Sequence, residues 1–101
     1  MAELFSVRCT DPGSWEVVGE LDLATAPVFE TSLTADWRDG DLRLDCSGLA
    51  FMDSQGVRSM LVVAGARPAD GRLVLRNLTP EVRRIADLVQ LGSAPGIVIE
   101  A

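Results

Sequence analysis

The segment from Leu42 to Ala64 constrains the fold most, because its hydrophobic period changes part-way along it. Leu42, Leu44 and Cys46 alternate with polar residues, which is the two-residue period of a strand with one buried face. After Phe51, apolar residues recur at spacings of three and four, as they do on a helix that packs one side against a core. These positions are Val57, Met60, Leu61 and Ala64. The sequence therefore predicts a strand that leads directly into a helix.

The segment Asp53-Ser54-Gln55-Gly56 joins the predicted strand to the predicted helix. Asp and Ser often cap helices, because a side-chain oxygen can accept hydrogen bonds from the unpaired amides of the first turn. We therefore expect Ser54 at or near the helix N-terminus, where unpaired amides and the helix dipole favour an anion or a phosphate added to a hydroxyl. The alternative, which the pattern alone favours, is that Asp53 and Ser54 only cap the helix.

Upstream, two alternating segments, residues 4–10 and 15–19, flank the turn sequence Asp11-Pro12-Gly13. Proline fixes one torsion of such a turn and glycine tolerates positive φ, so we predict an antiparallel hairpin. A helix is then predicted from about Thr25 to about Trp37, because apolar residues recur every four positions and Pro27 suits a first helical turn.

Further downstream, residues 72–76 and 97–99 are predicted strands, with a helix between them that begins after Thr79-Pro80 and ends at Gly92. The apolar stripe of that helix is Val82, Ile85, Ala86 and Val89. The resulting order is β-β-α-β-α-β-α-β, an α/β fold with a mixed sheet of four to five strands. The charged side of the central strand indicates that helices cover mainly one face of the sheet.

Length and composition fit a single domain over residues 1–101. An apolar content of 48% in 101 residues is enough for a core without disulfides or metals. The chain has no apolar run of about eighteen residues or more, and its N-terminus lacks the basic start and apolar stretch of a signal peptide. We therefore expect a cytoplasmic location without membrane insertion.

Charge and residue types argue against nucleic-acid binding and against catalysis. A net charge of −6 opposes contact with nucleic acid and with anionic membranes. The chain has no histidine to act as a general base, and Cys9 and Cys46 are too few and too far apart in sequence for a metal site. We expect both cysteines to be reduced residues of the core or the sheet edge, and we expect no enzyme activity, cofactor or metal.

Three segments match one known pattern over nearly the whole chain. They are Gly19-Glu20-Leu21-Asp22 followed by Ala26-Pro27, the stretch Leu44 to Ser54 followed by Gly56, and Asn77-Leu78-Thr79-Pro80 with Val82 and Leu91-Gly92. With these segments in this order, the chain resembles the STAS domain, and within that family the stand-alone anti-sigma factor antagonists of bacteria.

The resemblance implies a binding module that is controlled by phosphorylation. In that family, the unphosphorylated domain binds an anti-sigma factor that is also a serine kinase, and thereby frees a sigma factor. The kinase phosphorylates a hydroxyl at the start of this helix, the complex dissociates, and a serine phosphatase resets the domain. A phosphate on Ser54 would bring a charge of about −1.5 to −2 beside Asp53 and towards Asp22, so repulsion and desolvation would separate the partners.

Two positions depart from the family pattern. Gln55 stands where many members carry a second hydroxyl, which leaves Ser54 as the acceptor. Arg58 stands where a small residue is usual, one turn after Ser54 on the same helical face; it would pair with a phosphate, obstruct a kinase, or be a solvated surface arginine. Our candidates for binding a partner or shaping the site are Asp53, Gln55, Gly56 and Arg58. Asp22 is a further candidate, with a local loop cap as its alternative.

Four other large side chains have expected places. Phe51 and Met52 should pack beneath the loop, and exposure of either would favour a contact with a partner. Trp15 and Trp37 should cover the core or its edge, because single aromatic side chains usually contribute burial.

Two other functions remain open. The first is a STAS-like module that binds constitutively, as a subunit of a transporter complex or of a stress-sensing assembly, with Ser54 purely structural; Gln55 favours this interpretation. The second is an enzyme or small-ligand carrier, which the absence of histidine, of a metal cluster and of a phosphate loop disfavours. Whether the chain acts alone or as a homodimer is also open.

Overall fold

The computed structural model describes residues 4–68 and 70–100 of the chain. Its elements are β1 (Ser6–Asp11), β2 (Ser14–Leu21), α1 (Ala26–Thr34), β3 (Leu42–Met52), α2 (Ser54–Gly65), β4 (Leu73–Arg76), α3 (Pro80–Leu88), the 3₁₀ helix η1 (Leu91–Ser93) and β5 (Ile97–Ile99). The strands form one five-stranded sheet in the order β1-β2-β3-β4-β5. β1 pairs antiparallel with β2, and the other neighbours are parallel. The mixed α/β order predicted from the sequence is therefore confirmed.

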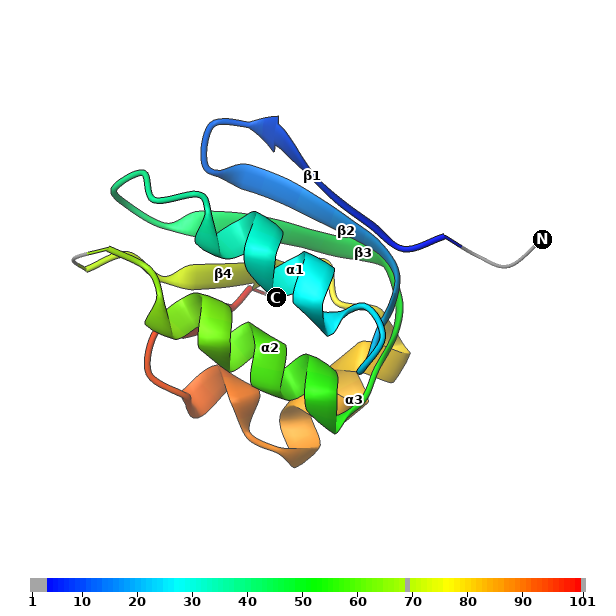
Figure 1. Cartoon of the computed structure of the whole chain (residues 1–101). Helices are drawn as coiled ribbons and strands as arrows, with labels where there is room; N and C mark the ends of the chain where they lie inside the picture. The colour runs from blue at the N-terminus through cyan, green and yellow to red at the C-terminus, as the bar shows by residue number, and fades with distance from the viewer. Residues whose placement is uncertain (1–3, 69, 101) are drawn as a thin grey trace.

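One face of the sheet carries the helices (Figure 1). α1 and α2 lie across this face and contact each other, and α3 packs against β3. Leu42, Leu44 and Cys46 are fully buried beneath them, whereas Arg43 between them is exposed on the open face. The two-residue period of β3 thus reports which face of the sheet is covered.

The core is formed where the helices meet this covered face. Apolar side chains of all three helices are buried against β3 and β4, which removes their surface from water and provides most of the folding free energy. From the helices these are Phe29, Leu33, Met60, Val63, Val82 and Ala86; from the two strands they are Leu42, Leu44, Cys46, Leu49, Leu73 and Leu75.

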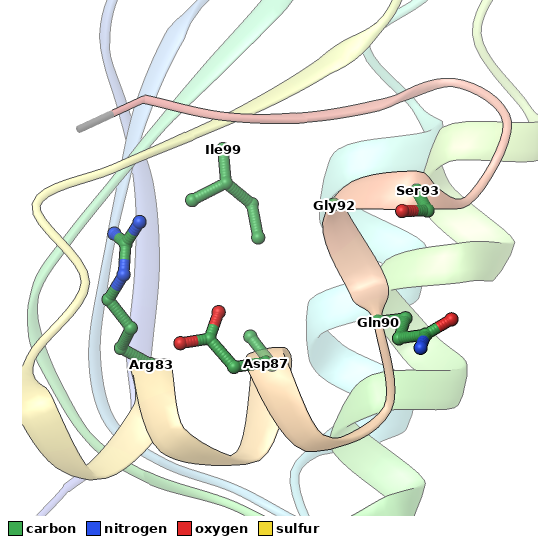
Figure 2. Close-up of a pocket in the computed structure, with 7 residues that line it drawn as sticks. Arg83, Asp87, Gln90, Gly92, Ser93 and Ile99 are labelled. Atoms are coloured by element: carbon green, nitrogen blue, oxygen red, sulfur yellow. The ribbon is translucent and has the colours of Figure 1, made fainter.

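The end of α3 differs from the sequence prediction, in which Gly92 ends the helix. The helix ends at Leu88, and Gln90 adopts a left-handed backbone with a φ of 56°. The chain then forms η1, which buries Leu91, and turns back into β5 (Figure 2). A left-handed residue just after a helix is a common stop, and here Gln90 takes the place that we assigned to glycine.

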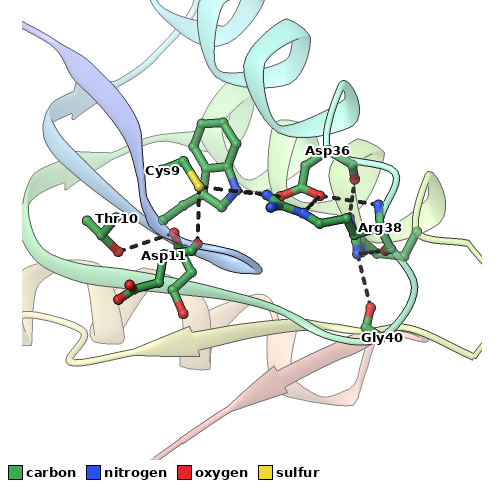
Figure 3. A network of polar contacts seen from close by, with 9 residues as sticks. Cys9, Thr10, Asp11, Asp36, Arg38 and Gly40 are labelled. Carbon is green, nitrogen blue, oxygen red and sulfur yellow. Dashed lines mark hydrogen bonds and ion pairs between the residues drawn. The ribbon is translucent and has the colours of Figure 1, made fainter.

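A polar network holds the loop between α1 and β3 at the N-terminal end of β3 (Figure 3). Arg67, which is nearly buried, donates to the carbonyl oxygens of Asp36, Arg38 and Gly40, the last two at 2.7 and 3.0 Å. The Asp36 carboxylate accepts from the indole of Trp15 at 2.7 Å and from the Arg38 guanidinium at 2.7 Å. These bonds fix the loop in one conformation at the end of the sheet opposite to Ser54.

Trp37 is the clearest failure of the helix prediction, since it was expected on the buried stripe of α1. The helix ends at Thr34, so the four-residue spacing no longer applies at this position. Asp36 turns inwards to bind Trp15 and Arg38, and Trp37 points outwards with 79% of its surface exposed. Trp15 is half-buried and packs against the core, as expected.

Candidate functional site

Asp53 and Ser54 have separate places at the start of α2. Asp53 has an extended backbone and is the N-cap, and its Oδ1 accepts from the backbone N of Gln55 at 2.9 Å and of Gly56 at 3.1 Å. Ser54 is the first helical residue. The capping that the sequence allowed to either residue is therefore performed by the Asp53 carboxylate alone.

Ser54 is exposed at the surface, and its side chain carries a hydroxyl. Among the residues that the structure describes, it has no hydrogen-bond partner. It lies at the positive end of the α2 dipole, where negative charge is favoured. Gln55 beside it is half-buried and carries no hydroxyl. Ser54 thus offers an accessible hydroxyl that the fold does not use.

Gly56 allows α2 to begin close against β2. A Cβ at this position would lie 2.4 Å from Cγ of Met52 and 2.7 Å from the carbonyl oxygen of Leu21. The same carbonyl accepts from the backbone N of Asp53 at 3.4 Å. Gly56 is fully enclosed by these contacts, so it shapes the site by positioning the helix start.

Asp22 enters the site from the neighbouring strand. β2 and β3 are parallel, and Leu21 lies opposite Met52, so Asp22 and Asp53 leave the sheet side by side at the same edge. The half-buried Asp22 carboxylate accepts from the backbone N of Ala24 at 3.0 Å and of Thr25 at 3.2 Å. It therefore caps its own loop, and it also places a second negative charge at the edge that carries Ser54.

An apolar groove of about 370 Å³ opens beside Ser54. It is lined by Phe51, Met52, Asp53, Ser54, Val57, Ile85 and Val89. Of the lining residues, Met52 is buried, whereas Phe51 and Val89 are 43% and 51% exposed. The groove brings the end of β3, the first turn of α2 and one side of α3 together around the serine hydroxyl.

Phe51 and Val89 were expected to be covered, and their exposure corrects that prediction. β3 carries an extra residue relative to β2 at two places. After Cys46 the buried positions of β3 are therefore three residues apart, at Leu49 and Met52. Phe51 consequently faces outwards. Val89 lies one residue beyond α3, where the helical stripe no longer faces the core. Both side chains become walls of the groove.

Residues 11–99 match the family model described as Mlab, STAS domain. The chain belongs to the STAS domain family. Among curated protein sequences, none matches significantly.

Three solved structures share the fold of this STAS domain. The anti-sigma factor antagonist SpoIIAA in its unphosphorylated form is 23% identical with a TM-score of 0.73, covering 97% of this chain and 89% of its own. An anti-sigma factor antagonist from Mycobacterium paratuberculosis is 26% identical with a TM-score of 0.69, covering 94% and 84%. A candidate anti-sigma factor antagonist from Thermotoga maritima is 16% identical with a TM-score of 0.70, covering 96% and 86%.

Arg58 lies one turn after Ser54 and is exposed. Within residues 4–68 and 70–100, its guanidinium forms no ion pair. The guanidinium is therefore free of any carboxylate of the described part of the STAS domain. Ser54 and Arg58 do share one exposed side of α2, as their spacing predicts.

A second hollow, of about 450 Å³, lies between α3, η1 and β5 (Figure 2). Its polar walls include the half-buried Arg83 and the exposed Asp87, which carry opposite charges. It contains neither Ser54 nor any other sequence candidate.

Among the described residues, no cluster of three His, Cys, Asp or Glu side chains could hold a metal ion. Likewise, none of the helices described here is long and apolar enough to cross a bilayer.

The sequence pattern predicted the start of α2 but not the groove of this STAS domain. Ile85 and Val89 belong to a predicted core stripe, and nothing in their spacing distinguishes a groove wall from a core residue. One signal was available: the stripe of α3 continues to Val89, close to the predicted helix end, where coverage by the sheet is hardest to maintain.

Proposed function

We propose that this STAS domain is an anti-sigma factor antagonist controlled by phosphorylation of Ser54. The unphosphorylated domain binds an anti-sigma factor that is also a serine kinase, and a sigma factor is thereby released. The observation that carries the proposal is the Ser54 hydroxyl, exposed and without a hydrogen-bond partner among the described residues, at the rim of an apolar groove. The domain acts in this scheme as a single unit over residues 1–101.

The groove supplies the attractive part of the interaction. Phe51 and Val89 present apolar surface to solvent, and covering such surface is favourable by about 25 cal/mol per Å². Phe51 is the largest of these apolar side chains, and aromatic residues are enriched in protein interfaces. A partner side chain in the groove would lie directly against Ser54.

Phosphorylation supplies the repulsive part. A phosphate adds about −1.5 to −2 charge at a surface that the partner must desolvate. Asp53 and Asp22 already place two carboxylates at this edge of the sheet. Both are engaged in capping amides, so neither can turn away from the phosphate without loss of a cap. Dissociation then follows with little change of fold, and a serine phosphatase restores binding.

The comparisons support this role. Two of the solved structures compared above are those of anti-sigma factor antagonists, and SpoIIAA is described in its unphosphorylated form. The relative from Mycobacterium paratuberculosis is 26% identical over 94% of this chain. The proposal transfers their role to this chain on the strength of the exposed serine.

The test is phosphorylation by the kinase-type anti-sigma factors of the source organism. Each purified kinase is incubated with the domain and ATP, and the intact mass is measured. We expect one added phosphate with at least one kinase, and none on Ser54→Ala. Ser93→Ala is the matched control, because Ser93 is also exposed but lies in η1. Phosphate addition to Ser54→Ala would contradict the assignment.

Gln55 supports one alternative, a constitutive binding module of a larger assembly. An amide at this position cannot be phosphorylated, and the groove can bind a partner with Ser54 unmodified. This alternative predicts that a partner binds Ser54→Asp as tightly as the unmodified domain. The antagonist role predicts that Ser54→Asp weakens binding.

A further inference from the structure

The outer side of α2 is unusually apolar for a helix surface. Ser54, Arg58, Leu61, Val62 and Gly65 are exposed on this side, and Leu61 and Val62 retain 42% and 38% of their surface. Surface helices normally carry several charged residues on the side that faces water. Over its 12 residues α2 has one, Arg58. A helix of this composition is suited to being covered on its outer side as well.

The Arg58 guanidinium has no polar partner among the described residues. It forms no ion pair within the part of the chain that the structure describes, and its neighbours on the helix surface, Ser54 and Leu61, are uncharged. It lies one turn from the N-terminus of α2, the end at which the helix dipole favours negative charge. A positive charge there does not stabilise the helix, so its place is better explained by binding.

We propose that the outer side of α2 docks a protein that presents a carboxylate to Arg58 and apolar side chains to Leu61 and Val62. This rests on the proposed function and makes Arg58 the specificity-determining residue of the same interface. Removed from water between apolar neighbours, a guanidinium and a carboxylate form paired, charge-assisted hydrogen bonds of defined geometry. The surface is continuous with the groove, because Val57 lines the groove from the adjacent side of α2.

The charge on this side of the helix selects a different protein over a second copy of the chain. In a two-fold symmetric contact through α2, each residue meets the same patch of the partner. Where the two-fold axis passes close to Arg58, the two guanidinium groups approach each other, and α2 has no carboxylate to separate them. Like charges opposed in an interface are unfavourable, whereas a partner with an acidic group opposite Arg58 is complementary.

The proposal adds a second effect to phosphorylation. Residues four apart on a helix are neighbours, so a phosphate on Ser54 lies within reach of Arg58. The phosphate then takes the guanidinium that the unmodified domain offers to the partner's carboxylate. Phosphorylation thus adds repulsion at the groove and removes the one positive charge of the docking side.

The test measures, by isothermal titration calorimetry, the dissociation constant of each unphosphorylated variant for the kinase-type anti-sigma factor that phosphorylates the domain. We expect Arg58→Glu to weaken binding by about 30-fold or more, and Arg58→Lys to weaken it less, because lysine keeps the charge but loses the paired geometry. Arg84→Glu on α3, an equally drastic reversal of an exposed arginine, should change binding less than about twofold. A single Asp→Lys or Glu→Lys substitution in the kinase should restore binding to Arg58→Glu.

Unchanged binding of Arg58→Glu, with lost binding of Ser54→Asp, would overturn the proposal and leave the phosphorylation switch intact. If no kinase-type anti-sigma factor binds the unmodified domain, the proposed function falls, and this inference with it. Thermal unfolding of Arg58→Glu should match that of the unmodified domain, which confirms that a loss of binding is not a loss of fold.

Discussion

The carboxylate of Asp53 caps α2 and thereby leaves the hydroxyl of Ser54 unused. Oδ1 of Asp53 accepts from two amides of the first turn, those of Gln55 at 2.9 Å and Gly56 at 3.1 Å, so the helix start is capped without the Ser54 hydroxyl. Ser54 is consequently exposed in the first turn of the helix. Because Asp53 and not Ser54 caps the helix, a modification of Ser54 is compatible with an intact fold.

Asp53→Ala should destabilise the domain, whereas Ser54→Ala should not. Loss of the cap leaves two amides of α2 without their acceptor and costs about 1 kcal/mol of unfolding free energy. Ser54→Ala should change the free energy of unfolding by less than about 0.5 kcal/mol, as is usual for exposed positions. Urea unfolding measures both. Equal losses would show that the two residues share the capping.

Gly56→Ala should destabilise the domain by about 1–3 kcal/mol, because the added methyl group has no room beside Met52 and Leu21. Gly65→Ala in the same helix is the matched control. A Cβ at Gly65 meets nothing within 4 Å, so the greater helix propensity of alanine should leave stability unchanged or raise it. Urea unfolding of the pair gives the comparison, and a similar effect at both positions would contradict the close contact at Gly56.

Asp36 should make stability depend on pH in the acid range. Its hydrogen bonds from the Arg38 guanidinium, opposed by burial and supported by the Trp15 indole, hold the pKa of this carboxyl well below its usual range. A carboxyl whose pKa is lower in the folded state stabilises the folded domain. This stabilisation is complete at a pH above the pKa of the unfolded state, about 3.9, and it is lost as the pH falls through the pKa of the folded state.

The variant Asp36→Asn tests this dependence. It should lose about 1.5–3 kcal/mol of unfolding free energy at pH 7, the range for hydrogen bonds to charged groups. The difference from the unmodified domain should shrink steadily once the pH is lowered below about 4. Denaturant unfolding at several pH values provides the measurement. A difference that does not vary with pH would mean that the Asp36 charge is not involved.

The two cysteines should differ in reactivity. Burial raises the pKa of the Cys46 thiol to about 12, so thiolate is scarce at neutral pH and a reagent cannot reach it. Cys9 in the edge strand β1 is exposed. Alkylation of the folded domain at pH 8 should therefore add one label, which Cys9→Ser removes. Two labels at similar rates without denaturant would indicate that Cys46 is not held in the core.

The sequence predicted those features that follow from local pattern. The alternation of Leu42, Leu44 and Cys46 identified the buried face of β3, and the change of period after Phe51 identified α2. Asp and Ser at that junction were enough to place the helix start, but not to decide which side chain caps it. That choice depends on the backbone conformation of Asp53, which sequence spacing does not specify.

The features that the sequence could not predict depend on contacts between elements. The bulges of β3 turn Phe51 outwards because β2 beside it is shorter by two residues over the paired stretch. Trp37 is exposed because Asp36 binds Trp15, which precedes it by more than twenty residues. The groove exists only where β3, α2 and α3 meet, so no single stretch of sequence contains it.

The most direct test of the central claim compares the affinity of the unphosphorylated domain and of the Ser54-phosphorylated domain for the anti-sigma factor that phosphorylates it. The dissociation constants are measured by isothermal titration calorimetry in the absence of ATP. We predict that phosphorylation of Ser54 weakens binding by at least about tenfold. The same dissociation constant for both forms would contradict the account, because the charge of this side chain would then have no part in docking.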